Sequence, residues 1–262
     1  MAQKSCWMCG APASSKEHRL KKADIQRAYG SGPYRGDESP IHFFAGKQTV
    51  IQGPDSKTLK YDAFLCHRCN TATTQPFDNA YDQLVSWVFA HEEQIVKYRL
   101  IDFEEVYGSD FPSRQTDLYK YFAKSFGCRL VDAGYQAPKD VVELFPLSNF
   151  RTALRITFSI NEDVLNLMPK NWRDGFIGKG DLLYYASPDA PEVHTGYVWD
   201  EHVSWFTVHF WYDVPPWPKL GATWVADSQC VYLGSNRPLT DDQRTEFSSL
   251  VPDFKPHNPA NE

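Results

Sequence analysis

The sequence contains no long apolar run. A membrane-spanning helix needs about 18 or more consecutive apolar residues, and no segment of the 262 residues approaches that length. The first ten residues, MAQKSCWMCG, also lack the apolar stretch of a secretory signal. These two absences predict an intracellular, cytoplasmic protein without a membrane span.

The chain as a whole also lacks an excess of basic charge. Its formal net charge is -6, which argues against a polyanionic partner for the whole surface. The charge is unevenly distributed, however. Residues 1–70 contain 11 Lys and Arg against 6 Asp and Glu, whereas the remaining residues contain 16 against 27. Since counterion release acts locally, the basic N-terminal part is suited to phosphate, although its lysines could equally be simply solvated.

Cysteine is scarce, but four of the six cysteines form two Cys-x-x-Cys pairs. Cys6 and Cys9 make the first pair, and Cys66 and Cys69 make the second. Two such pairs supply the four thiolates of a closed tetrahedral zinc site, which is favoured over a redox role in a reducing compartment. The two remaining cysteines are expected to be buried free thiols: Cys128 and Cys230.

The first half of the chain predicts mainly helices after a hairpin. Apolar runs at 41–51 and 58–66, separated by Gln-Gly-Pro-Asp-Ser-Lys, are typical of two strands joined by a turn. Apolar residues spaced by three and four predict a helix from about 76 to 98. Further helices are expected near 22–29, 116–126 and 138–145, with Gly127 ending the second of these.

The second half predicts strands. Successive runs of strand-forming residues between turn signals indicate a mainly β module from about 150. Its aromatic residues are expected in the core, although a subset could stack on nucleic-acid bases. The aromatic residues in question are Trp199, Trp205, Phe206, Phe210, Trp211, Tyr212, Trp217 and Trp224.

Glu17, His18 and Asn70 lie next to the cysteine pairs and have the chemistry of a hydrolytic site. Phosphodiester hydrolysis needs a base for water and a cation near the phosphate. His18 can be the base, because its ordinary pKa of about 6.5 leaves a neutral fraction at pH 7. Adjacent strand residues point to opposite faces, so Glu17 can address a metal while His18 addresses water. An Asn70 amide oxygen suits Mg²⁺ or Mn²⁺, or it could merely cap the helix that follows.

Four basic residues close to this group are candidate phosphate contacts. Arg19, Lys21 and Lys22 follow His18 directly, and Arg68 lies within the second cysteine pair. Beyond the second pair, Asp78 is the favoured further metal ligand, and Gln75 and Asp82 are alternatives.

The order of these motifs resembles a known family. Cys-x-x-Cys, an acid followed by His, and then Cys-x-x-Cys-Asn before a helix is similar to the HNH, or ββα-metal (His-Me finger), endonucleases, especially their four-cysteine branch that includes endonuclease VII. The resemblance covers about residues 6–82. It implies Glu17 and Asn70 as ligands of a catalytic Mg²⁺ or Mn²⁺, His18 as general base, and the four cysteines on structural zinc. The 47 residues between His18 and Cys66 exceed a minimal core, so part of 30–60 must be an insertion or a long hairpin.

The sequence therefore predicts an α+β protein with a zinc-stapled ββα-metal nuclease core (1–100), a helical connector (101–149) and a β-rich module (150–262). The implied activity is cleavage of DNA, leaving 3′-hydroxyl and 5′-phosphate ends, and a homodimer is one expected form. Family habit suggests a setting in restriction or anti-phage defence. Two alternatives stay open, namely a non-catalytic zinc-stabilised module that binds nucleic acid or protein, and a nuclease that acts on RNA.

Overall fold

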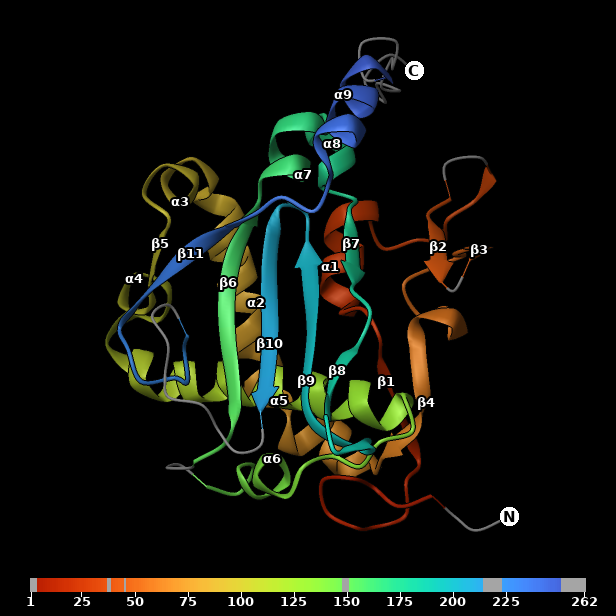
Figure 1. Cartoon of the computed structure of the whole chain (residues 1–262), viewed down its shortest axis with the longest axis vertical. Coiled ribbons are helices and arrows are strands. Elements are labelled where there is room, and N and C mark those ends of the chain that lie inside the picture. Colours follow the sequence, from red (N-terminus) through yellow and green to blue (C-terminus); the bar gives the residue numbers. More distant parts are fainter. Residues whose placement is uncertain (1–3, 37–38, 45, 148–150, 214–222, 251–262) are drawn as a thin grey trace.

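The computed structural model describes residues 4–36, 39–44, 46–147, 151–213 and 223–250. The chain is mixed α and β, with the four cysteines near the N-terminus and a large sheet toward the C-terminus (Figure 1). The helices of the described part are α1 (Lys22–Tyr29), α2 (Gln75–Ala90), α3 (Glu92–Tyr98), α4 (Phe103–Tyr107), α5 (Phe111–Asp132), α6 (Lys139–Glu143), α7 (Glu162–Leu167), α8 (Lys170–Arg173) and α9 (Asp241–Leu250). Shorter helical turns are η2 (Lys57–Leu59), η3 (Cys69–Thr73), which is π-helical, and η4 (Gly108–Asp110).

The strands form one large sheet and two small ones. The strands are β1 (Ser15–His18), β2 (Ile41–Phe44), β3 (Lys47–Val50), β4 (Lys60–Leu65), β5 (Leu100–Asp102), β6 (Leu154–Asn161), β7 (Ile177–Lys179), β8 (Leu183–Ser187), β9 (Ala190–Val203), β10 (Phe206–Asp213) and β11 (Cys230–Asn236). The large sheet has the order β5-β11-β6-β10-β9-β7, with β8 on β9. Its pairs are antiparallel except β11 with β6. The two small sheets are β1 with β4 and β2 with β3.

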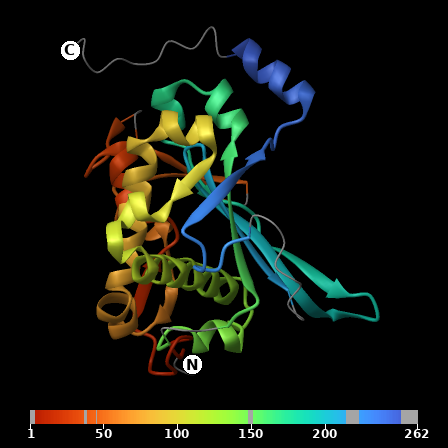
Figure 2. The ribbon, with the colours of Figure 1, turned by 90° about the vertical axis from the view of Figure 1, so that its left-hand side faces the viewer.

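Helices α2 and α5 pack on one face of the large sheet, and the hairpin of β8 and β9 extends away from them (Figure 2). Helix α2 starts with Pro76 in its first turn, where the missing N–H costs nothing. Its buried residues recur at three and four, as the sequence predicts, and they are Phe77, Ala80, Tyr81, Leu84, Val85 and Val88. The helix ends at Ala90, and α3 begins after His91, so the predicted single helix is two.

The larger of two hydrophobic clusters among the described residues joins α2 and α5 to the large sheet. A smaller cluster contains Ile25, Ile51 and Leu59. Trp199, Trp205, Phe206, Phe210 and Trp224 are at most 2% exposed, which confirms that most of the predicted aromatic residues are core. Trp211 is 37% exposed, and Trp217 lies outside the described residues. The predicted domain boundaries stay predictions, but β5 comes from residues 100–102 and pairs with β11 near the other end of the chain.

The predicted hairpin between 41–51 and 58–66 is wrong. The first run folds on itself, because Gly46 adopts a φ of 75° at the turn between β2 and β3. The second run instead pairs, as β4, with β1. The cause is the cysteine framework, since the first cysteine pair precedes β1 and the second follows β4.

Two smaller expectations are also corrected. Gly127 does not end a helix, because α5 continues to Asp132. Its missing side chain instead admits the Trp7 ring, since a Cβ atom there would lie 2.4 Å from that ring. Cys128 is buried as expected, but Cys230 is exposed because alternate residues at the start of β11 face solvent. No helix in the described ranges is both long and apolar enough to cross a bilayer.

Candidate metal centre and active site

The two cysteine pairs converge on one point. The sulfur atoms of Cys6, Cys9, Cys66 and Cys69 all lie within 4.8 Å of one another. A tetrahedral zinc ion with Zn–S bonds of about 2.3 Å separates its sulfur atoms by about 3.8 Å, and the Cys9 and Cys66 sulfur atoms are 3.7 Å apart. The four thiols therefore fit a structural zinc ion without rearrangement of the chain.

Backbone contacts shape both cysteine turns. In the first turn, the Gly10 N–H donates to the Cys6 carbonyl (2.8 Å), and the Trp7 N–H donates to the Phe64 carbonyl of β4 (3.1 Å). In the second turn, the Cys69 N–H donates to the Cys66 sulfur (3.4 Å). That donor lowers the pKa of Cys66 to about 7, whereas burial raises the pKa of Cys69. The second turn thus already favours one thiolate, and a bound cation would favour the rest.

Asn70 lies beside β1 because it directly follows Cys69. Its side-chain amide nitrogen donates to the Ser15 hydroxyl (2.9 Å) and to the Lys16 carbonyl (3.3 Å). The amide makes no capping bond to α2, whose first residues follow Thr74, so the capping alternative is wrong. Its oxygen is buried and has no hydrogen-bond partner within the described part of the chain. A buried, unpaired amide oxygen is an available ligand for a hard cation.

Glu17 lies two residues after Ser15, the β1 residue that holds Asn70. The carboxylate of Glu17 is 3.4 Å from the ammonium of Lys124 on α5. The same ammonium lies 3.0 Å from the carboxylate of Asp78 on α2. A lysine therefore lies between two of the carboxylates that the sequence assigns to the catalytic metal, and the metal and the ammonium would compete for them.

Lys124 is only 2% exposed. Burial alone would lower its pKa, but Glu17 and Asp78 outweigh burial and hold the pKa of Lys124 above its usual range. For Asp78, burial acts to raise the pKa, and the nearby Lys124 and Lys21 together bring it below its usual value. Lys124 and Asp78 are thus charged together at neutral pH.

His18 contacts a different part of the chain from Glu17. Its Nε2 atom lies 3.5 Å from the carboxylate of Asp55, near enough for attraction once the ring is protonated but without hydrogen-bond geometry. Burial lowers the pKa of His18, and Lys60 lowers it further, whereas Glu17 and Asp55 oppose the change. The ring is therefore neutral at pH 7, with a buried and unpaired nitrogen, as a general base requires.

The four predicted phosphate contacts differ in availability. Arg19 binds both carboxylate oxygens of Asp132 (2.6 and 2.9 Å) and lies over Tyr61. Lys21 pairs with Asp78 (2.9 Å), and Lys22 pairs with Asp55. Arg68 is exposed and has no ion pair within the described residues. Three of the four cations thus already hold carboxylates in the folded chain.

Sequence reasoning missed two residues of this arrangement. Asp55 lies in the loop before η2, and the hydrogen bonds from Lys22 and Lys60 lower its pKa to about 2. Lys124 lies on α5, beyond the segment with the family resemblance. The turn residues around Asp55 indicate a loop but only weakly suggest a functional role, and nothing in the sequence indicates a functional role for Lys124. Of the alternative ligands, Asp82 lies 3.6 Å from Lys21, and Gln75 donates to Asn79 on the helix surface.

No family model matches this chain, and comparison with curated proteins and with solved structures finds no match. The function of this protein is therefore inferred from the geometry of the chain and from the motif resemblance.

Proposed function

We propose that this protein is a metal-dependent endonuclease of the ββα-metal type, which hydrolyses phosphodiester bonds in DNA. One observation carries the proposal. The four-thiol cluster brings the unpaired amide oxygen of Asn70 beside β1, the strand that carries both Glu17 and a neutral His18. Restriction or anti-phage defence stays a prediction for its cellular setting.

The proposed residues divide the reaction between them. Asn70 and Glu17 would hold the catalytic Mg²⁺ or Mn²⁺, which when bound neutralises charge on the phosphate and the leaving oxygen. His18 Nε2 accepts the proton of the attacking water as the new P–O bond forms and the bond to the 3′-oxygen breaks. Asp55 then stabilises the imidazolium from 3.5 Å. Solvent protonates the departing oxygen, which gives 3′-hydroxyl and 5′-phosphate ends.

Structural zinc would be held by Cys6, Cys9, Cys66 and Cys69. Its part is to fix β1 against η3, because the first cysteine pair precedes β1 and Asn70 directly follows Cys69 in η3.

The test is nicking of supercoiled plasmid by the purified zinc-loaded protein with Mg²⁺ or Mn²⁺. General-base catalysis contributes about 10²- to 10⁴-fold, so His18→Ala should lose activity by that factor. Asn70→Ala should also be inactive and should bind Mn²⁺ more weakly in a titration followed by electron paramagnetic resonance. Equal nicking by His18→Ala would assign the activity to a contaminant. A parallel assay with structured RNA tests the other substrate.

A second function is supported by Lys124. Its ammonium lies where a cation between Glu17 and Asp78 would lie, which favours a zinc-stabilised module that binds nucleic acid or protein without cleaving it. Absence of nicking across both metals and both nucleic acids, with zinc present at one ion per chain, would favour this second function.

A further inference from the structure

The hairpin of β2 and β3 exposes more apolar surface than its own folding explains. Ile41, Phe43 and Val50 are 61%, 67% and 58% exposed, and Phe44 is 54% exposed. Two strands alone are marginally stable, and this pair belongs to no larger sheet. Single exposed apolar residues are ordinary, but four on one short hairpin mark a surface that contacts something else.

The two faces of the hairpin differ. His42 and Phe44 lie on one face with their rings stacked, 6.2 Å between centroids, and the guanidinium of Arg19 lies 5.7 Å from the Phe44 ring. That face is turned toward the end of β1. On the opposite face, Ile41 pairs across the strands with Val50, and Phe43 pairs with Gln48. Phe43 is thus an aromatic ring at the centre of an open apolar surface.

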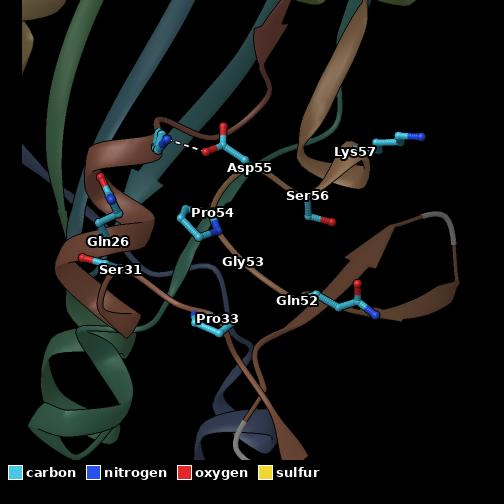
Figure 3. A pocket seen from close by; sticks show the side chains of 10 residues that line it. Gln26, Ser31, Pro33, Gln52, Gly53, Pro54, Asp55, Ser56 and Lys57 are labelled. Carbon is cyan, nitrogen blue, oxygen red and sulfur yellow. Dashed lines mark hydrogen bonds and ion pairs between the residues drawn. The ribbon is translucent and has the colours of Figure 1, made fainter.

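A pocket lies next to the segment that follows the hairpin. It has a volume of about 570 Å³ and lies between α1 and the loop that follows β3 (Figure 3). Gln52, two residues beyond the hairpin, lines one side, and Asp55, the neighbour of His18, lines another. Lys22 and Lys57 also line it.

The charge around this surface suits a polyanion. The strands and turn from 41 to 50 contain Lys47 and no acid. Arg35, Lys47 and Lys57 are exposed, and none has an ion pair within the described ranges. The acid Asp55 is already held by Lys22 and Lys60. Exposed aromatic rings among free cations are the combination that binds single-stranded nucleic acid, because bases stack on the rings while cations follow the phosphates.

The hairpin of β8 and β9 provides the contrast. It also exposes apolar residues, and these are Leu183, Tyr184, Tyr185 and Val193. Residues 181–203, however, contain five acids and no Lys or Arg, so this surface repels phosphate. Aromatic exposure alone therefore does not distinguish the two hairpins, but their charge does.

We propose that the β2–β3 hairpin is the substrate-gripping surface of the proposed nuclease and that it binds an unpaired strand through base stacking on Phe43. This inference rests on the proposed function and narrows its substrate to nucleic acid with single-stranded or unstacked bases. In a duplex, base faces are covered by their neighbours, so Phe43 reaches them only where stacking is interrupted.

The experiment measures binding separately from cleavage. His18→Ala, loaded with zinc and with Ca²⁺ in place of Mg²⁺, is titrated against a fluorescent 20-nucleotide single strand and the matching duplex, followed by anisotropy. Stacking is worth about 1–3 kcal/mol per base, so adding Phe43→Ala should weaken single-strand binding about 5- to 150-fold. Duplex binding should change less than about twofold. Phe43→Tyr should restore binding, and Tyr184→Ala, on the acidic hairpin, should have no effect.

Several results would overturn the inference. Unchanged single-strand affinity in Phe43→Ala, with a melting curve like that of the parent, would remove the hairpin from substrate binding. Light scattering that shows a dimer that Phe43→Ala converts to a monomer would make the surface a contact between copies. If the wild type nicks plasmid while Phe43→Ala binds normally, only this inference fails. If the wild type does not nick but binds a single strand through Phe43, the inference stands and the proposed nuclease activity fails.

Discussion

The ammonium of Lys124 and the carboxylate of Glu17 lie 3.4 Å apart, although they belong to a long central helix and to a short strand near the N-terminus. Asp78 completes the group at 3.0 Å from the same ammonium. The candidate active site thus depends on α5 as well as on the segment with the family resemblance.

Replacing Lys124 should be costly. Removing one partner of a buried ion pair costs about 3–5 kcal/mol, because the other charge is left uncompensated. We expect Lys124→Met to lower the free energy of unfolding by about that amount in urea denaturation. The double variant Lys124→Met/Asp78→Asn should recover part of the loss, since it removes one of the stranded carboxylates. A single variant as stable as the wild type would show that the network carries little of the folding energy.

The pH dependence of cleavage should report the environment of His18. Burial lowers the pKa of His18, and activity requires its neutral form. The rate should therefore rise with pH, with a midpoint below the value of about 6.5 expected of an ordinary histidine. Asp55→Asn should move the midpoint lower still, because it removes a charge that raises this pKa and leaves Lys60 uncompensated. The measurement is kcat/KM against pH with both proteins. A midpoint above 6.5 in the wild type would contradict the assignment of His18.

Loss of one zinc ligand should unfold the N-terminal part. Structural zinc contributes on the order of 10 to 16 kcal/mol in small zinc-binding domains, which matches or exceeds the net stability of most domains. Cys66→Ser should therefore lose zinc and make at least residues 1–80 sensitive to protease. The control is Cys230→Ser, because Cys230 is exposed and lies outside the cluster. Metal analysis that finds no zinc in the wild type would remove the basis of the site.

Gly127→Ala tests the docking of the first cysteine turn on α5. Alanine favours a helix by about 1 kcal/mol over glycine, but the new Cβ would lie 2.4 Å from the Trp7 ring. Trp7 cannot retreat freely, since its backbone is bonded to β4 and its ring packs edge-on against Phe145. Overpacking of this kind costs about 1–3 kcal/mol, so we expect net destabilisation in a thermal melt. Gly234→Ala is the matched control, because a Cβ atom there would lie 3.8 Å from its nearest neighbour, the Phe158 carbonyl oxygen.

The features that could be predicted from the sequence are those with short-range signals. The cysteine spacing predicts the four-thiol cluster, and the periodicity of 77–88 predicts the buried face of α2. The predicted partner of β4 is wrong because the local turn residues favour pairing with the nearest strand. The cysteine framework instead brings β1 to β4 from farther away in the sequence.

The candidate site shows the same division. Asn70 lies against Ser15 and Lys16 of β1 because the cysteine pairs, whose spacing is visible in the sequence, set a fixed geometric relation. Lys124 could not be found, because a lysine in an amphipathic helix looks solvated until the fold shows what covers it. The ion pair between Lys21 and Asp78 could not be predicted either, because nothing in the local sequence distinguishes an ion-paired lysine from a free one.

Strand β5 has a consequence for how the protein can unfold and evolve. Residues 100–102 form an edge of the large sheet by pairing with β11. A chain cut after residue 100 would divide β5 itself and would expose to water the apolar stripe of α2 that α5 covers. We therefore expect a single cooperative melting transition. We also expect that the cysteine-bound segment would not fold independently if it were transferred to another protein.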